Sequence, residues 1–358
     1  MKNIFSKWWG SAAVVVAGAA MLASCNKELP QPTAIVPPTP SGQTMTQVLA
    51  ANAKYSILRA AITRAGSNLT FNPSDPTAVY TLFAPDNDAF IASGIPNETA
   101  VSGLPAATVA SIVNAHVIPG VELKAADLST AFPNMYMQSG LVLSATPPVP
   151  YRMPVFPSRR TAGAWFNNIP VKAADIDASN GVIHDIARVF FPPSQVIAQV
   201  AAANPDLTYL MAALARADAG PPTGAPQLIP ILSNAAANLT VFAPTNQAFQ
   251  NLFAAMGLPT GISTISALPT QTVWGIVAFH VLGSRAYSVN LAAGNSTAAS
   301  IMGVAQQINV TGANVTVRGP GNNLPTTPPT PYAAKVITAD VNTINGVVHI
   351  VDAVLLPQ

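Results

Sequence analysis

The feature that most constrains this chain is an internal repeat. Three motifs occur twice in the same order: Thr81–Phe90 and Thr240–Phe249, Leu104–Val117 and Leu268–Val281, and Asn180–His184 and Asn345–His349. The offset between copies grows slowly, from 159 to 165 positions, as insertions in loops would make it do. The repeat predicts two homologous domains, 44–193 and 194–358, each long enough to enclose its own core.

Within each copy the hydrophobic period changes along the chain. Val109, Ile112, Val113 and His116 follow the i, i+3, i+4, i+7 spacing of one helix face. Val79–Phe83 has a strand pattern that Pro85 ends, and Asp86 or its counterpart Thr245 suits the N-cap of a following short helix. Asn180-Gly181 and Asn345-Gly346 stand between strand-like runs and predict β-hairpins with type I′ turns. Helices first and antiparallel strands later indicate an α+β domain.

Composition excludes several classes of protein. Charged residues make up only 8% of the 358 residues, and the 16 Lys and Arg are scattered. A nucleic-acid partner is therefore not expected, because such proteins need clustered cations to neutralise phosphates. The single cysteine excludes an intramolecular disulfide and any zinc site built from several cysteines.

The N-terminus has the pattern of a signal peptide. Lys2 and Lys7 precede an apolar run, Ala12–Leu22, which is too short to span a bilayer. The run ends in Leu-Ala-Ser-Cys, which resembles the bacterial lipobox and implies cleavage after residue 24 and acylation of Cys25. The alternative is a free thiol beside an ordinary cleavage site. Residues 25–43 are rich in proline and are expected to be a semi-rigid spacer.

Four histidines are placed by the repeat, His116 with His280 and His184 with His349. They could bind metal or act in acid–base chemistry, but their positions on an apolar helix face and on hairpin strands favour buried imidazoles that bond to the backbone. A stable zinc site needs three or four ligands. The candidate carboxylates are scattered: Asp175, Asp185, Asp340 and Asp352.

No other catalytic pattern occurs in the sequence. There is no Gly-x-Ser-x-Gly elbow, phosphate loop or His-Glu-x-x-His pair. Asp86 and Asp88 have Thr245 and Gln247 as counterparts, which favours helix capping over a paired-carboxylate site, and Arg159-Arg160 is interpreted as a solvated loop. We therefore expect no catalytic residue, no cofactor and no bound metal.

The motifs resemble the fasciclin domain in both copies and in the family's order. The resemblance implies a wedge of two small β-sheets with helices packed on one side, and a secreted or surface adhesion module without established catalytic activity. It implies a mainly structural role for the motif residues, which are Phe83, Pro85, Asn87, Phe90, His116, Asn180, Gly181 and His184, and Phe242, Pro244, Asn246, Phe249, His280, Asn345, Gly346 and His349.

The chain departs from the family pattern at the residue before the first histidine of each copy. The family usually has tyrosine there, whereas this chain has Ala115 and Phe279, so receptor binding through a Tyr-His motif is not expected. Proline-rich inserts at Thr146–Pro157 and Leu324–Pro331 are expected to be surface loops.

Aromatic residues near the first insert are a possible ligand platform: Tyr151, Phe156, Trp165 and Phe166. Exposed rings can stack on sugars or on apolar partner surfaces. The alternative is that these rings cover the domain's own core.

These patterns together predict a lipid-anchored surface adhesion or scaffold protein of a bacterial cell envelope, at the outer membrane or cell surface. Its partner would be a polysaccharide, a matrix polymer or a protein. Two alternatives remain open: a surface hydrolase using His and Asp of one repeat, and a carrier of a small ligand or metal.

Overall fold

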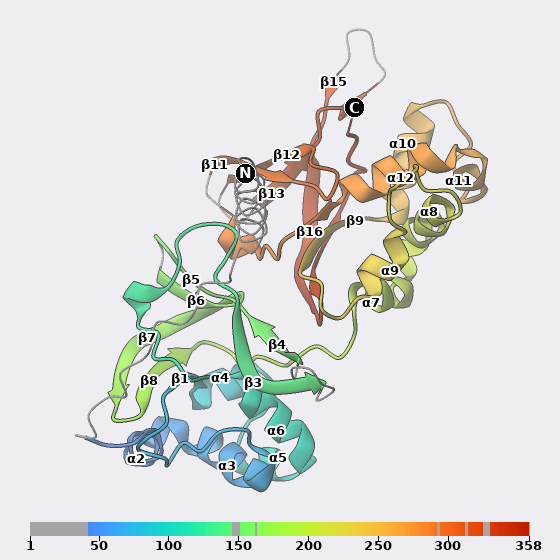
Figure 1. The fold of residues 1–358 in the computed structure, drawn as a ribbon. Coiled ribbons are helices and arrows are strands. Elements are labelled where there is room, and N and C mark those ends of the chain that lie inside the picture. Colours follow the sequence, from blue (N-terminus) through green and yellow to red (C-terminus); the bar gives the residue numbers. More distant parts are fainter. Residues whose placement is uncertain are drawn as a thin grey trace, which may run out of the picture. The chain divides into compact units, whose positions relative to one another are not determined.

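The computed structural model describes residues 42–144, 151–161, 163–291, 294–311, 314–324 and 330–357. The expected signal peptide, Cys25 and nearly all of the spacer lie outside the described residues. Among the residues that are described, no helix is long and apolar enough to cross a membrane. Domain 1 (44–193) and domain 2 (194–358) repeat one element order, as Figure 1 shows.

The helices of domain 1 pack together beside its sheet (Figure 1). These helices are α2 (Met45–Ala51), α3 (Ser56–Ala65), α4 (Asn87–Ala92), α5 (Glu98–Ser102) and α6 (Ala106–Ala115). Its strands are β1 (Tyr80–Pro85), β2 (Val117–Pro119), β3 (Met137–Ser144), β4 (Tyr151–Val155), β5 (Pro157–Arg160), β6 (Gly163–Phe166), β7 (Ile169–Ala178) and β8 (Gly181–Ile186). Short 3₁₀ turns join some of these elements.

Domain 2 has the same arrangement, with one additional helix, α9, and a longer α10. They are α7 (Ile197–Ala203), α8 (Thr208–Asp218), α9 (Leu228–Ser233), α10 (Asn246–Ala255), α11 (Ser263–Ala267) and α12 (Thr270–Phe279). The strands are β9 (Leu239–Pro244), β10 (Val281–Leu282), β11 (Gly294–Ala299), β12 (Ala305–Thr311), β13 (Asn314–Arg318), β14 (Asn323–Leu324), β15 (Thr330–Pro331), β16 (Ala334–Thr343) and β17 (Gly346–Val351).

The strand orders of the two main sheets match over six strands, and domain 2 adds a seventh, β11, at one edge. They are β2-β1-β8-β7-β6-β5 in domain 1 and β10-β9-β17-β16-β13-β12-β11 in domain 2. The central pairs β1–β8 and β9–β17 are parallel, with Tyr80 opposite Gly181 and Leu239 opposite Gly346. The sequence predicted antiparallel strands, and this parallel pair is the exception: about a hundred residues separate its members, so no local turn signals the pairing.

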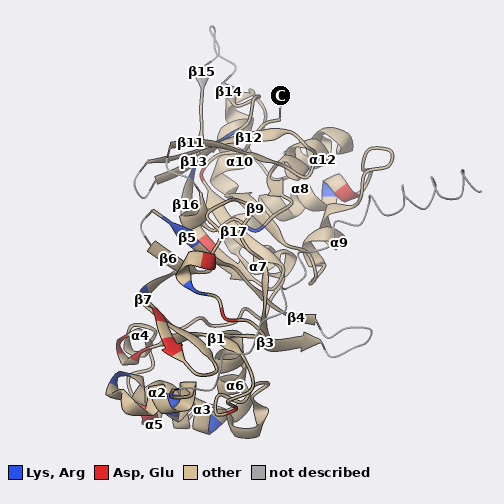
Figure 2. Ribbon diagram, turned by 60° about the vertical axis from the view of Figure 1, so that its left-hand side comes forward, with Lys and Arg blue, Asp and Glu red and all other residues tan. Residues whose placement is uncertain are grey.

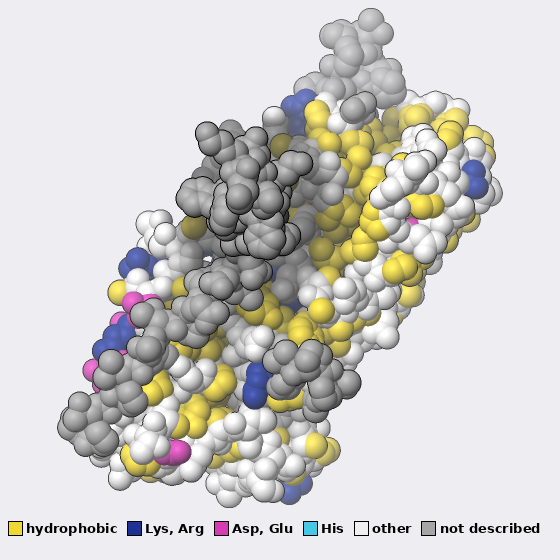
Figure 3. All heavy atoms as spheres, in the orientation of Figure 1, with side chains coloured by type: hydrophobic (Ala, Val, Ile, Leu, Met, Phe, Trp, Pro, Cys, Tyr) yellow, Lys and Arg dark blue, Asp and Glu magenta, His cyan; other side chains and the backbone are white. Residues whose placement is uncertain are grey.

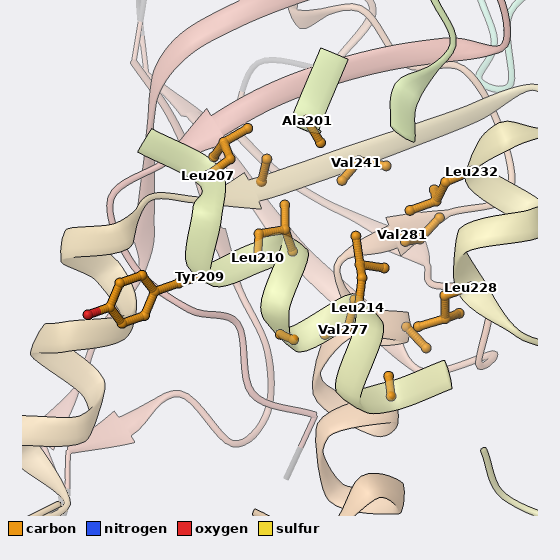
Figure 4. Packing of buried hydrophobic residues seen from close by; sticks show 14 of the residues in the cluster. Ala201, Leu207, Tyr209, Leu210, Leu214, Leu228, Leu232, Val241, Val277 and Val281 are labelled. Atoms are coloured by element: carbon orange, nitrogen blue, oxygen red, sulfur yellow. The ribbon is translucent and has the colours of Figure 1, made fainter. Parts of the chain in front are cut away.

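Alternate side chains of each central strand face two different cores. Both faces of the strand are therefore buried, and its sequence is a continuous apolar run. In domain 1, Leu82 and Ala84 face the helical core, while Phe83 faces a second core formed with the other strands. Domain 2 repeats this division with Val241 and Phe242. Figure 4 shows the helical core of domain 2, where side chains of α8 converge on the sheet. The α+β fold with helices on one side of the sheets is thereby confirmed.

A bulge bends the longest strand of each domain. The pairing of β7 with β8 shifts register around Asp175, and that of β16 with β17 shifts around Asp340. Both aspartates have positive φ, 59° and 60°, a conformation that Asp tolerates better than most residues. The bend lets one strand pair with the central sheet at one end and with the outer strands at the other.

The predicted hairpins are present, but their turns differ from the prediction. Ala178 pairs with Gly181 and Thr343 with Gly346, so the two turn residues are Ser179-Asn180 and Ile344-Asn345. A type I′ turn needs positive φ at both turn residues, and neither asparagine has it. The type I′ assignment was wrong because the asparagine side chain, described below, fixes the turn by its own hydrogen bonds.

The first proline-rich insert is not only a surface loop. Residues 145–150 lie outside the described residues, but Tyr151–Val155 form strand β4, and Met153 and Val155 are fully buried. The expectation of a surface loop was therefore wrong for this half, whose alternate residues pack into the second core. In the second insert, β14 and β15 form a two-stranded ladder, and residues 325–329 lie outside the described residues.

Candidate functional site

The Phe-Ala-Pro segment joins a central strand to a capped helix in both domains. Phe83 stacks on Phe166 with ring centroids 4.3 Å apart and lies 5.1 Å from the His184 ring. Behind Pro85, Asp86 Oδ1 accepts the Ala89 N–H at 2.9 Å, and Thr245 does the same for Ala248 at 3.2 Å. The motif therefore builds the transition from strand to helix, and Phe90 and Phe249 are buried beyond it.

Asn87 and Asn246 tie that transition to the preceding helix. Asn87 Oδ1 accepts the Ile57 N–H at 3.1 Å, and its amide donates to the Ala53 carbonyl at 3.2 Å. Asn246 makes the equivalent bonds with Tyr209 and Pro205, at 3.0 and 2.9 Å. Each asparagine thus satisfies backbone groups at the start of α3 or α8.

His116 and His280 close the last turn of their helices. His116 Nδ1–H donates to the Ile112 carbonyl at 2.7 Å, and its Nε2 accepts the Phe190 N–H at 2.9 Å. His280 repeats both bonds with Ile276 and Leu355. Both rings are 1% exposed, and burial lowers the pKa of each to about 4. These imidazoles are neutral at pH 7, with both nitrogens occupied by the backbone.

His184 and His349 use the opposite tautomer. His184 Nε2–H donates to the Leu123 carbonyl at 2.8 Å, while Nδ1 accepts the Asp175 N–H at 3.2 Å. His349 does the same with Ala286 and Asp340. Burial lowers the pKa of both rings. The imidazole therefore holds the strand bulge in place.

The bulge aspartates complete this unit. Asp175 Oδ1 accepts the Ala125 N–H at 2.8 Å, and Asp340 Oδ1 accepts the Ser288 N–H at 2.8 Å. No partner for these aspartates could be predicted from the sequence, because the pattern of one strand does not show which loop lies beside it. The one sign in the sequence that they have a structural role was that they occupy equivalent positions in the two repeats.

Asn180 and Asn345 are fully buried clamps. Asn180 Oδ1 accepts the Met45 N–H at 2.9 Å, and its amide donates to the carbonyls of Pro73 and Asp75, both at 3.0 Å. Asn345 makes the same three bonds, with Ile197, Leu232 and Asn234. Each side chain therefore joins the hairpin turn to the first helix and to the segment before the central strand, which is a loop in domain 1 and the end of α9 in domain 2.

The glycine after each asparagine is required by close packing. A Cβ on Gly181 would lie 1.9 Å from the Tyr80 carbonyl oxygen, and one on Gly346 would lie 2.3 Å from that of Leu239. Gly181 also has a φ of +127°, which side chains with a Cβ rarely adopt.

A charged cluster that the sequence did not predict lies at the carboxyl ends of β1 and β8. Asp185 accepts hydrogen bonds from Lys54 and from the Tyr55 hydroxyl, and Asp86 pairs with Lys172. Burial, reinforced by the Asp185 carboxylate, raises the pKa of Tyr55. In domain 2 the equivalent positions are Asp206, Leu207, Thr245, Ile337 and Ile350, so three of the five are apolar. Comparing the repeats position by position would have revealed this difference.

The charges of this cluster are compensated internally. Asp185 is 2% exposed and Asp86 is 7% exposed, while their lysine partners are more than a third exposed. Figure 2 shows how sparse charges are elsewhere on the ribbon. Within the described chain, no group of three or more His, Cys, Asp or Glu side chains could hold a metal ion.

The proposed aromatic platform is not a single exposed surface. Phe166 is fully buried in the second core, and Phe156 is 4% exposed and packs against Tyr136 and Tyr287. Tyr151 donates its hydroxyl hydrogen to the Ala235 carbonyl at 2.7 Å. The platform hypothesis is wrong for the two phenylalanines: Phe166, at the end of β6, packs into the second core, and Phe156, between β4 and β5, packs against Tyr287. Of the four, Tyr151 and Trp165 are the ones that keep partial exposure.

The expected basic loop at Arg159-Arg160 is a strand end. Both arginines belong to β5, and Arg160 donates to the Asn134 side chain at 2.7 Å and to the Thr130 carbonyl. The Arg160 guanidinium is thus used to hold the segment before β3.

Comparison with known proteins agrees with the repeated architecture. The family model "Fasciclin domain" matches residues 53–192 and 223–357. Immunogenic protein MPB70 of Mycobacterium bovis is 34% identical over 163 residues, which is 45% of this chain and 68% of MPB70. Protein sll1483 of Synechocystis is 33% identical over 168 residues, 43% of this chain and 77% of that protein.

More distant matches include an animal protein and a solved structure. The pig transforming growth factor-beta-induced protein ig-h3 is 33% identical over 44% of this chain and 20% of its own length. The structure of a domain pair from the insect cell adhesion molecule fasciclin I covers 85% of this chain and 98% of that chain, at 16% identity and a TM-score of 0.37. The two family matches together span more than half of the sequence, and the chain therefore belongs to the fasciclin family, with two copies of its domain.

Proposed function

We propose that this chain is a lipid-anchored adhesion or scaffold protein of a bacterial cell envelope, at the outer membrane or cell surface. Its two domains would bind a polysaccharide, a matrix polymer or a partner protein. Fasciclin domains are associated with cell-adhesion and surface proteins, which supports this class of function.

The observation that carries the proposal is the burial of the repeated polar motif residues. The four histidines are each at most 1% exposed, and Asn180 and Asn345 are fully buried. Their hydrogen-bonding groups are used on backbone atoms in both domains alike. The motifs therefore build the modules, and partner contacts are left to the surface.

The same burial argues against the hydrolase alternative. A general base must come within hydrogen-bond reach of its substrate, about 2.6–3.2 Å. Among the residues that the structure describes, the closest approach of a histidine to a carboxylate is 3.9 Å, between His184 Nδ1 and Asp175 Oδ1. That imidazole is fully buried and already bonded at both nitrogens.

Membrane anchoring through Cys25 is the part of the proposal most directly tested. Several acyl chains on one residue hold a protein stably on a bilayer, whereas one chain binds marginally. Cys25→Ala should move the chain from the membrane fraction to the soluble fraction, or leave an uncleaved precursor. Ser24→Ala is the matched control and should remain anchored. Processed Cys25→Ala that stays on membranes would contradict the anchor.

Partner binding calls for a screen of the full chain against glycan arrays and cell-envelope fractions. We expect retention by at least one polymer or envelope protein. His116→Gln, which alters the core and not the surface, should keep that binding at temperatures where domain 1 is folded. Loss of binding in a folded His116→Gln variant would show that the histidine acts on the partner directly.

A further inference from the structure

A cavity of about 480 Å³ opens beside α12 in domain 2. Its walls are apolar side chains from α10 and α12 and from two later segments; among them are Leu252, Phe253, Met256, Ile276, Met302 and Leu356. Figure 3 shows hydrophobic side chains gathered on the face of the molecule where α12 lies. The volume falls within the range of about 300–1,000 Å³ that is usual for small-molecule sites.

The cavity is lined by polar side chains at its exposed end and by apolar side chains in its buried part. Among the lining residues, the polar side chains are Gln271 and Thr272, both exposed, and none is charged. Phe253, Val273 and Val277 are at most 3% exposed and belong to the helical core. The lining follows α12 from Gln271 to Val277, a rise of about 9 Å along the helix. A ligand that matches this lining is elongated, apolar for most of its length and uncharged at its polar end.

Water is a poor occupant of such a cavity. A buried water molecule needs two to four polar partners, and the deep walls offer apolar groups. Transfer of a hydrocarbon chain into the cavity would release that water and remove apolar surface from solvent. Met256 and Met302 are flexible side chains that adapt to irregular apolar ligands.

Two departures between the repeats build this cavity. Helix α10 has ten residues where α4 of domain 1 has six, and the added turn carries Leu252 and Phe253. In α12, Gly275 stands where α6 has Ser111, and a Cβ there would meet nothing closer than Met302 Cε at 3.9 Å. A glycine in the middle of a helix lowers its stability, yet here it keeps the wall open.

We propose that this cavity binds a single-chain lipid with an uncharged head, such as a monoacylglycerol. The acyl chain lies along α12 beside Gly275, and the head group remains in water near Gln271 and Thr272. This binding is separate from the adhesion proposed above, since it uses one domain and no polymer surface.

The test is calorimetric titration of 1-monodecanoylglycerol, below its micelle concentration, into the full chain carrying Cys25→Ala, so that no attached acyl group competes. We expect saturable binding with one lipid per chain and a negative heat-capacity change, the marker of apolar burial. Gly275→Leu fills the cavity and should weaken binding roughly tenfold or more. Because leucine favours helix more than glycine does, this variant should remain folded.

Matched variants make the result decisive. Gly275→Ala adds one methyl group and should bind within about threefold of the parent. Ser111→Leu, at the equivalent site of domain 1, should not change binding. If Gly275→Leu precipitates, Gly275→Met provides the same test with a more flexible side chain.

Three outcomes would overturn the proposal. They are absence of saturable binding, equal binding by Gly275→Leu and the parent, and tighter binding of decanoate than of monodecanoylglycerol. The last result would show that the site selects a charged head, contrary to its uncharged lining.

Discussion

Single residues in this chain show that a repeated polar motif need not be a site of chemistry. His116 and His280 make the same two backbone bonds in different domains, from the same helix end. Their spacing on an apolar face predicted burial, and the structure places them there. The particular bond partners, Phe190 and Leu355, lie 74 and 75 residues away, so periodicity could not reveal them.

Burial of these imidazoles predicts loss of stability in acid. The pKa of His116 is about 4 in the folded protein, against an ordinary value of 6.5. Between those values the unfolded chain binds the proton and the folded chain does not, so the free energy of unfolding falls as pH falls from 6.5 toward 4. Above pH 6.5 the contribution is complete. The expected slope is roughly 1.4 kcal/mol per pH unit for each such histidine.

The measurement is urea unfolding at about pH 7 and pH 5, followed by pulsed hydrogen exchange on peptides from each domain. His116→Gln cannot titrate, so domain 1 of that variant should lose about 2 kcal/mol less than the parent over this interval. Domain 2 retains His280 and serves as the internal control. Equal pH dependence in both forms of domain 1 would show that His116 is not the titrating group.

The hairpin asparagines give a second prediction for single residues. Asn180→Ala removes three hydrogen bonds to buried backbone groups and should lower the free energy of unfolding of domain 1 by about 2–3 kcal/mol. Asn345→Ala should have a similar effect in domain 2, because its three bonds are equivalent.

Asn180→Asp tests which half of the amide matters. It keeps the acceptor for Met45 but places a carboxylate oxygen against the carbonyls of Pro73 and Asp75. We expect it to be at least as destabilising as alanine, by chemical denaturation. A variant as stable as the parent would contradict the clamp.

At the scale of elements, the sequence predicted the features that depend on residues close together in the chain. The N-caps at Asp86 and Thr245 and the helix ending at His116 are formed by residues within one turn of each other. The parallel pairing of β1 with β8 and the bulge at Asp175 depend on segments distant in sequence. Phe156 lies between β4 and β5, and Phe166 ends β6, so their inward direction likewise depends on how these strands pack in the folded domain. These features needed the three-dimensional structure.

Two glycines in different elements should respond to alanine in opposite directions. Gly275 lies within helix α12 with space for a Cβ, so Gly275→Ala should raise the free energy of unfolding of domain 2 by about 1 kcal/mol. Gly181→Ala forces a Cβ against the Tyr80 carbonyl at positive φ and should lower that of domain 1 by about 3 kcal/mol or more. Thermal unfolding of the two variants measures both effects. Destabilisation by Gly275→Ala would mean that no space exists beside α12.

At the scale of the whole molecule, the repeat predicted the fold twice over, but the two domains have diverged inside. Domain 1 has a charged cluster around Asp185 where domain 2 is mostly apolar, and domain 2 has an apolar cavity beside its longer α10. The turns and bulges of both domains are held by the shared pattern of buried asparagines and histidines. The side chains that differ between the domains do not hold them, so these side chains can change without loss of the fold.

The charge of the chain gives the last prediction. Of the 16 Lys and Arg, Lys2 and Lys7 lie in the expected signal peptide, so 14 remain against 14 Asp and Glu. A neutral surface with few charges makes its contacts through amides, hydroxyls and apolar groups, which salt screens little. Affinity for the envelope partner should therefore change less than about threefold when NaCl rises from about 50 to about 500 mM.

Surface plasmon resonance on immobilised envelope polymer, over a salt series, measures this dependence. A variant that adds cations at exposed positions, such as Thr63→Lys with Thr99→Lys, is the matched control and should acquire a salt-dependent association rate on an anionic polymer. A parent chain whose affinity falls steeply with salt would require a cationic patch that the residue count does not provide. In that case, contact through neutral surfaces would be wrong, while the two-domain fold and its buried clamps would stand unchanged.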